Sequence, residues 1–148
     1  MITWQLKHFN QLTTVELYTI LQLRSEVFVV EQTCPYLDPD GKDIYCHHLM
    51  GYMGNDLAAY SRLVPAGVSY AEVSIGRVIS SPKYRGQQYG KLLMQKAIEE
   101  IEQLYGSAPI RIGAQAYLKQ FYEGFGFVDL NQPYLEDGIP HIIMLRKA

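Results

Sequence analysis

The stretch VSIGRVISSPKYRGQQYGK, from Val73 to Lys91, decides how this chain folds. Its first half has the β-branched pattern of a strand, Ser81-Pro82 interrupts that pattern, and a helical sequence takes over after Gly90. We therefore predict a strand, a tight loop and a helix N-terminus. The first turn of a helix leaves backbone N–H groups without intrahelical acceptors and carries the positive end of the helix dipole, so this loop suits a phosphate group.

Two cations accompany the loop. Arg85 and Lys91 flank it and would add positive charge beside a bound phosphate. The alternative is an ordinary strand-to-helix turn whose basic residues are only solvated, and the spacing alone does not decide between the two. A nucleotide triphosphate-binding domain is disfavoured, because the pattern GxxxxGK[ST] is absent.

The N-terminal half is predicted to begin with a strand and a helix. Residues 2–9 alternate apolar and polar side chains, which indicates a half-buried strand. A hydroxyl N-cap with Glu16 in the first turn predicts a helix from about Thr14 to Val30, although the β-branched run at its end would also suit a second short helix or a loop. A long loop over 32–45 and a β-hairpin made of 46–53 and 57–64 follow.

The C-terminal half is predicted to alternate helices and strands. After the phosphate loop, apolar residues at helical intervals predict an amphipathic helix that ends at Gly106 and Pro109. We then expect a strand at 110–114, a helix at 116–125, and closing strands at 127–130 and 141–146 joined by a loop. This order predicts an α/β fold with a mixed central sheet and helices on both faces.

The composition narrows the classes of protein and of partner. The 148 residues suit one domain spanning residues 1–148, and 48% apolar and 19% charged residues are typical of a globular chain. A net charge of −2 gives no footprint for nucleic acid, and no apolar run is long enough to span a membrane, so we expect a cytoplasmic protein. Cys34 and Cys46 are expected to be free thiols, and we find no metal-ligand spacing.

A family resemblance adds to this interpretation. The run RVISSPKYRGQQYGKLLM resembles motif A of the GNAT superfamily of N-acetyltransferases, whose pattern is Arg or Gln, two residues, Gly, one residue, Gly or Ala. Arg85 and Gly90 match, while Gln88 stands at the central glycine and must adopt the loop conformation with a Cβ. GAQAYLKQFYEGFGF, residues 113–127, resembles motif B. VFVVEQTCPY near the front and YLEDGIPHIIM near the end resemble the ElaA-like branch of the superfamily.

The resemblance implies a binding site for acetyl-CoA. In the GNAT fold two central parallel strands, here 73–80 and 110–114, splay apart, and we expect Gly76 to mark the bulge that allows this. The alternative for residues 78–80 is plain strand. The implied cofactor-binding residues are Val78, Ile79 and Ser80 for the pantetheine arm, Arg85, Gly86, Gln87, Gln88, Tyr89, Gly90 and Lys91 for the pyrophosphate, and Gln115 and Tyr122.

The resemblance also implies catalytic roles. Tyr122 would protonate the departing thiolate, and the Val78 N–H would polarise the acetyl carbonyl. Several relatives use a carboxylate as general base at a position that is Ser74 here, so the base is open between Glu72, acting through water, and His141.

The acceptor pocket is expected to be acidic and aromatic. Glu31 and Glu136, with Asp137, would attract a cationic amine, although each also suits a solvated surface. Tyr36, Tyr45 and Tyr134 are candidates for the pocket wall. We thus predict an acetyl-CoA-dependent N-acetyltransferase, monomer or homodimer, that acts on a small-molecule or peptide amine. The alternative is a non-catalytic CoA-sensing or protein-binding module on the same fold.

Overall fold

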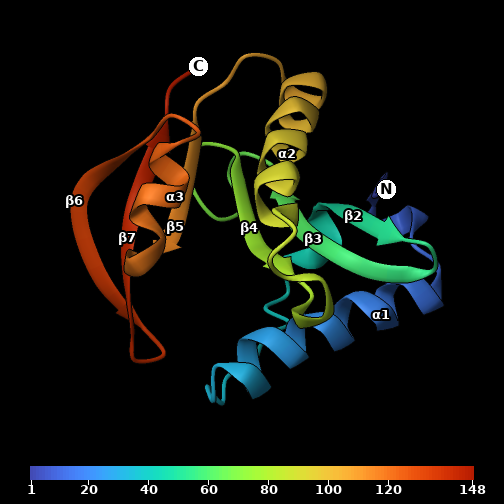
Figure 1. Cartoon of the computed structure of the whole chain (residues 1–148). Helices are drawn as coiled ribbons and strands as arrows, with labels where there is room; N and C mark the ends of the chain where they lie inside the picture. Colours follow the sequence, from blue (N-terminus) through green and yellow to red (C-terminus); the bar gives the residue numbers. More distant parts are fainter.

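Seven strands form two sheets that meet at one end (Figure 1). The computed structural model describes all residues, 1–148. The larger sheet is antiparallel and runs in the order β1 (Thr3–His8), β2 (His47–Met53), β3 (Asp56–Val64) and β4 (Ser74–Ser80). The smaller sheet is also antiparallel and contains, in order, β5 (Ile110–Gln115), β7 (Ile139–Arg146) and β6 (Phe127–Glu136).

The parallel neighbours β4 and β5 touch only at their beginnings. A single bridge joins Val73 to Ile110, and the Arg111 N–H donates to the Val73 carbonyl at 3.0 Å. Beyond this point the two strands diverge, as Figure 1 shows. The predicted mixed sheet with splayed central strands is confirmed.

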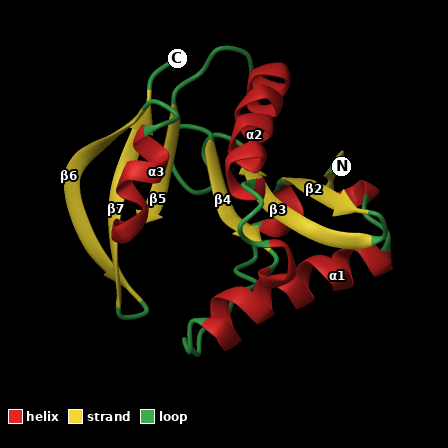
Figure 2. Cartoon of the chain, in the orientation of Figure 1, coloured by secondary structure: helices red, strands yellow, loops and turns green.

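Helices cover both faces of the larger sheet (Figure 2). α1 (Thr14–Arg24) packs on one face, where Ile20 and Leu23 join a core of seven buried residues. α2 (Tyr89–Tyr105) packs on the other face, within a core of 17 buried residues that also takes in Tyr122 of α3 (Lys119–Glu123). The larger core contains residues of both divergent strands, Ile75 of β4 and Ile110, Ile112 and Ala114 of β5.

The first helix follows the predicted capping chemistry. The Thr13 hydroxyl accepts from the Glu16 N–H at 3.1 Å, and the Glu16 carboxylate accepts from the Thr13 N–H at 2.8 Å. The open question at its end is resolved by a π-helical segment, Ser25–Glu31, that continues α1. Such wide turns recur at functional sites, and this one ends at a residue predicted to bind the acceptor.

Two boundaries in the C-terminal half differ from the prediction. The helix expected over 116–125 is a 3₁₀ turn, Ala116–Leu118, followed by the short α3. The loop expected between the closing strands is only the turn Asp137-Gly138, whose φ angles of 50° and 79° suit a two-residue hairpin. β6 continues past Pro133 because it is an edge strand, where the missing N–H leaves no ladder bond unmade.

Candidate active site

The loop before α2 has the geometry of an anion site. Gln88 adopts a left-handed conformation, with φ 60° and ψ 25°, and caps α2 without a side-chain hydrogen bond. The N–H groups of Gly86 and Gln88 donate to no backbone oxygen. Gln88 thus adopts the loop conformation despite its Cβ, as expected, and that conformation is left-handed. A cavity of about 530 Å³, called the loop cavity here, is lined by Ser80, Tyr84, Arg85, Gly86, Gln88, Tyr89, Gly90, Lys91, Gln95, Phe121, Gly124 and Phe125.

A second cavity of about 840 Å³, the splay cavity, lies between β4 and β5. The Ser81 N–H donates to the Ala58 carbonyl of β3 at 2.7 Å. Since backbone groups alternate along an antiparallel strand, the N–H and C=O groups of Val78 and Ser80 point away from β3, into the splay. All three strand residues predicted to meet the pantetheine arm line this cavity. Unpaired backbone groups at that edge suit a ligand that carries amides.

The bulge in β4 lies one residue from its predicted position. The register between β3 and β4 shifts after Tyr60, and the residue in the left-handed region is Arg77, at φ 50°, rather than Gly76. The guanidinium of Arg77 is held by the Asp38 carboxylate at 2.8 Å and the Asp38 carbonyl at 2.9 Å. These bonds offset the strain of a non-glycine residue at positive φ.

An ion-pair network fastens the long loop after α1 to the sheet. Asp38 is buried between Arg24, at 2.7 Å, and Arg77. Burial would raise the pKa of Asp40, but hydrogen bonds from Arg62 hold it well below its usual range. The full network comprises Arg24, Asp38, Asp40, Asp43, Arg62 and Arg77. It fixes one wall of the splay cavity.

Tyr122 reaches the splay cavity from α3. The residue is 7% exposed and lines the cavity, and its hydroxyl makes no hydrogen bond within the chain. Burial raises the pKa of Tyr122 to about 12, so the phenol is protonated at neutral pH. It is therefore a buried proton donor without an internal acceptor.

A tyrosine cluster lies on the opposite side of the cavity. The hydroxyl of Tyr134 lies so close to Gly113 that a Cβ there would come within 2.2 Å of it, and the Tyr70 hydroxyl would be 3.0 Å away. A side chain at this position of β5 would therefore displace the Tyr134 hydroxyl. Gln115, two residues on, shares that face, and its amide donates to Gln32 at 3.3 Å. Gln115 lines the splay cavity, so its expected place beside the cofactor stays a prediction, and its side-chain partner belongs to the loop after α1.

His141 is a buried residue in the wall of the splay cavity. It is 7% exposed, lines the splay cavity and packs against Tyr134, with 5.3 Å between ring centroids. Its Nδ1 lies 2.7 Å from the Ile139 carbonyl, which requires a proton on Nδ1 and leaves Nε2 with a lone pair in the neutral ring. Nε2 lies 3.5 Å from the Glu136 carboxylate. Proton uptake at Nε2 would create an ion pair.

Glu72, the other candidate for the base, is in the wrong place. Both of its carboxylate oxygens accept from Arg111, at 2.8 and 3.0 Å, and it does not line the splay cavity. The hydrogen bond from Arg111 lowers the pKa of Glu72. Glu72 is only two residues from Ser74, but it precedes β4, so strand alternation does not place the two side chains on one face. Ser74 itself is buried and lines the cavity.

Two residues that the sequence assigned to different ligands contact each other. Nη1 and Nη2 of Arg85 both donate to the Glu31 carboxylate, Nη2 at 2.7 Å. Nη2 also donates to the Ser80 carbonyl at 3.4 Å. The hydrogen bond from Arg85 lowers the pKa of Glu31. Nothing in the sequence signals this pairing, because 54 residues separate the partners.

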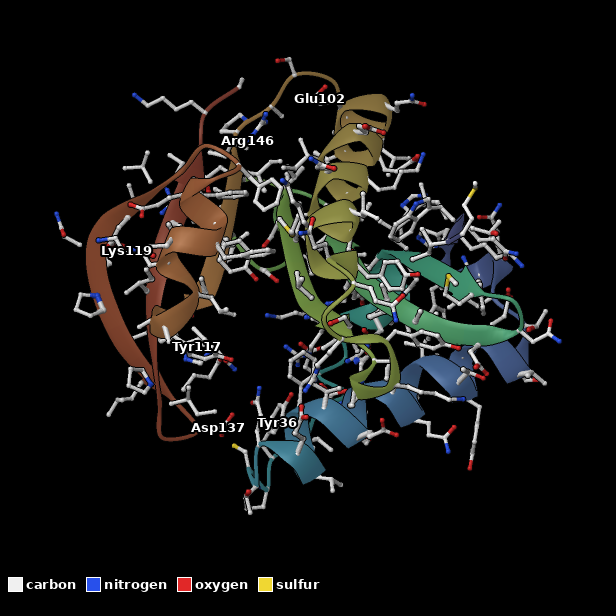
Figure 3. All side chains as sticks on the ribbon, viewed as in Figure 1. Tyr36, Glu102, Tyr117, Lys119, Asp137 and Arg146 are labelled. Atoms are coloured by element: carbon white, nitrogen blue, oxygen red, sulfur yellow. The ribbon has the colours of Figure 1, made fainter.

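The remaining predictions divide between the cavities and the surface. Gln87 lines neither cavity, and Tyr45 is 57% exposed and lines neither. Tyr36 and Asp137 lie at the lower end of the splay in Figure 3, while Glu102 and Arg146 lie at its upper end. Some residues that line the cavities were not predicted. They include Tyr70, Arg77 and Tyr117 in the splay cavity and Gln95 and Phe121 in the loop cavity. None of the helices is long and apolar enough to cross a membrane.

Comparison with known proteins identifies the family. Residues 47–147 match the model of an acetyltransferase (GNAT) domain. Protein ElaA of Escherichia coli is 44% identical over 100% of this chain and 98% of its own length. The crystal structure of an acyl-CoA N-acyltransferase from Pseudomonas aeruginosa has a TM-score of 0.94, with 47% identity and 99% of each chain covered.

A more distant structure shares only the fold. It is a GNAT family acetyltransferase from Elizabethkingia anophelis with acetyl-CoA bound, at TM-score 0.64 and 14% identity over 99% of this chain and 98% of that one. The chain belongs to the GNAT family of acetyltransferases, in its ElaA-like branch.

Proposed function

We propose that this protein transfers an acetyl group from acetyl-CoA directly to a primary amine of a small molecule or peptide. One observation carries the proposal: the splay cavity, edged by unpaired backbone groups of β4, joins the loop cavity, edged by unpaired amides before α2. Together they suit a ligand with an amide-bearing arm and a diphosphate. The Elizabethkingia protein, which has the same fold, is described with acetyl-CoA bound.

On the donor side, backbone groups and the cation of Lys91 would bind acetyl-CoA. Gly86, Gln88 and the first turn of α2 would donate N–H groups to the diphosphate, with Lys91 supplying charge. Val78 and Ser80 would pair with the amides of the pantetheine arm. The Val78 N–H, which points into the splay, would stabilise the oxyanion that forms when the amine attacks the acetyl carbon.

Two side chains would move the protons. The amine nitrogen forms a bond to the acetyl carbon and loses a proton to Nε2 of His141, where the carboxylate of Glu136 stabilises the resulting imidazolium. When the carbon–sulfur bond breaks, Tyr122 donates its hydroxyl proton to the thiolate. The two groups complement each other, because Nδ1 of His141 is bonded to the Ile139 carbonyl and leaves Nε2 as the acceptor, while burial holds the Tyr122 phenol protonated.

The acceptor side favours a cation. Glu136 and Asp137 lie at the β6–β7 turn, and within the chain the only side-chain partner of Glu136 is His141. Tyr36, Tyr70 and Tyr134 supply aromatic walls that suit an ammonium group. An amine that is protonated in solution would be drawn in by these carboxylates, would lose its first proton to solvent, and would lose the second to His141 as it attacks the acetyl carbon.

The experiment is thiol release from acetyl-CoA across a panel of amines, with CoA binding measured by calorimetry. We expect CoA to bind, and turnover with at least one amine. Tyr122→Phe should lower kcat by about 10²-fold, whereas Tyr18→Phe, a change at a 71% exposed tyrosine of α1, should leave it unchanged. His141→Gln should lower kcat/KM by about 10²-fold, because it removes the proposed proton acceptor. Absence of CoA binding would refute the proposal.

Ser74 supports a second candidate, a non-catalytic CoA-sensing or protein-binding module. A hydroxyl stands where several relatives have a carboxylate base, and a serine in this setting accepts no proton at neutral pH. The same experiment distinguishes the candidates: CoA binding without turnover on any amine would favour the module.

A further inference from the structure

The ion pair between Arg85 and Glu31 lies where the two cavities join. Only two residues, Ser80 and Arg85, line both the splay cavity and the loop cavity, whereas Glu31 lines the splay cavity alone. Arg85 contacts both others: its guanidinium binds the Glu31 carboxylate through two nitrogens and the Ser80 carbonyl through one. The guanidinium therefore lies across the passage from one cavity to the other.

The groups that Arg85 covers are the ones a ligand needs. The Ser80 carbonyl points into the splay, where it would accept from an amide of the pantetheine arm. Glu31 has no hydrogen-bond or ion-pair partner other than Arg85. While the pair is closed, the acceptor side of the splay cavity lacks the free negative charge of Glu31.

The ion pair is also weak enough for Arg85 to exchange Glu31 for another anion. Its side chains are 43% and 40% exposed, so solvent screens the attraction and the pair is weak. A diphosphate carries more negative charge than a carboxylate and offers the guanidinium the same two-pronged geometry. Arg85 begins the loop whose free amides line the loop cavity, so a diphosphate held there would lie within its neighbourhood.

We infer that Glu31 and Arg85 form an exchange switch that links the donor and acceptor sites. In the free protein Arg85 neutralises Glu31 and covers Ser80. When acetyl-CoA binds, Arg85 turns to the diphosphate, the Ser80 carbonyl becomes available to the pantetheine arm, and the freed Glu31 carboxylate becomes a cation site for the incoming amine. Donor binding thus prepares the acceptor site. This inference rests on the proposed function and adds an order of binding to it.

Calorimetry with CoA tests the exchange without any amine. Glu31→Gln removes the competitor for Arg85, so CoA should bind about two- to fivefold more tightly, the range expected for a half-exposed ion pair. Glu26→Gln is the matched control: it removes an equal charge from the same π-helical segment but no hydrogen bond to Arg85, and should leave the affinity within about 1.5-fold. A merely structural role would weaken binding instead.

The affinities separate the possible outcomes. Equal or weaker CoA binding by Glu31→Gln would overturn the switch while leaving the proposed function intact. If neither protein binds CoA, the proposed function fails and the switch with it. Pantetheine, which lacks the diphosphate, should gain less than CoA from Glu31→Gln, because only the covering of Ser80 is relieved; a gain with pantetheine equal to that with CoA would show a steric obstacle rather than an exchange of charge.

A second measurement follows Glu31 directly. Carboxyl-labelled NMR, with Glu31 assigned by the signal missing from Glu31→Gln, reports the pKa of Glu31, which the hydrogen bond from Arg85 lowers in the free protein. Saturating CoA should raise that pKa towards its ordinary value, because Arg85 has left. An unchanged or lower pKa in the complex would contradict the release of Glu31.

Discussion

Gly113 offers a sharp test of how the acceptor side is packed. A Cβ at this position would come within 2.2 Å of the Tyr134 hydroxyl, whereas ordinary contact begins near 3.4 Å, so the hydroxyl must retreat by about 1.2 Å, the difference between the two distances. The Tyr70 hydroxyl, at 3.0 Å, must give by a few tenths of an ångström. Because both side chains are half-buried, we expect Gly113→Ala to lower the free energy of unfolding by about 1–3 kcal/mol.

A control and a suppressor come from the same geometry. Gly76, on the facing strand β4, has no atom within 4 Å of an added Cβ and a φ outside the left-handed region, so Gly76→Ala should change stability by less than about 0.5 kcal/mol. Tyr134→Phe removes the obstructing oxygen and leaves the ring carbon at 3.5 Å, an ordinary contact. In the Tyr134→Phe background, Gly113→Ala should therefore cost far less.

The assay is a double-mutant cycle by urea denaturation. We expect a coupling free energy of about 1 kcal/mol or more between Gly113→Ala and Tyr134→Phe, in the direction of rescue. Equal destabilisation by Gly113→Ala in both backgrounds would refute the packing argument, because it would place the strain in the β5 backbone rather than in the tyrosine. Loss of stability in Gly76→Ala would show that both strands resist a methyl group regardless of the space available.

Three further outcomes are expected. Asp38→Asn should lower the free energy of unfolding by about 3–5 kcal/mol in urea denaturation, because it leaves buried Arg24 short of a partner. Glu100→Gln, which removes the i,i+4 pair with Lys96 in α2, should lower it by under about 0.5 kcal/mol. Burial lowers the pKa of His48, so the unfolded chain binds a proton that the folded chain excludes, and stability should fall as pH drops below about 6.5; a His48→Gln variant with the same slope would contradict this. Gln88→Gly should stabilise or be neutral, since it relieves a left-handed residue, whereas Gly86→Ala, at φ 85°, should destabilise by about 1–2 kcal/mol in thermal unfolding; the reverse order would exclude backbone strain as the cause.

Elements that depend on local chemistry were predictable from the sequence. The strand–loop–helix unit around Gln88, the capping of α1 and the β2–β3 hairpin each follow from residues close together in the chain. The turn Asp137-Gly138 was missed although its sequence is a hairpin signal, because Pro133 and Pro140 favoured a loop, and a proline is tolerated on an edge strand.

Contacts between distant residues were not predictable. No local pattern pairs Arg85 with Glu31, and none indicates which arginines the three aspartates in the loop after α1 bind. Glu72 was misplaced for the same reason, because its side chain is held by Arg111, 39 residues away in the chain. Ion-pair partners are chosen by the folded arrangement, which a single sequence does not encode locally.

The features that could be predicted lie mainly on the proposed donor side of the site, and those that could not lie mainly on the proposed acceptor side. The proposed donor side consists largely of consecutive residues, β4 and the loop into α2, whose backbone groups would bind the cofactor, so side-chain changes there are constrained mainly by φ angles and by space. The acceptor side is assembled from segments far apart in the chain, namely the loop after α1, the segment before β4, β5 and the β6–β7 turn. Because those segments meet through side chains, a substitution in one of them can alter which amine fits without disturbing the donor loop. Residues such as Tyr36, Tyr70 and Tyr134 are therefore where we expect relatives with the same donor site to differ in their acceptor.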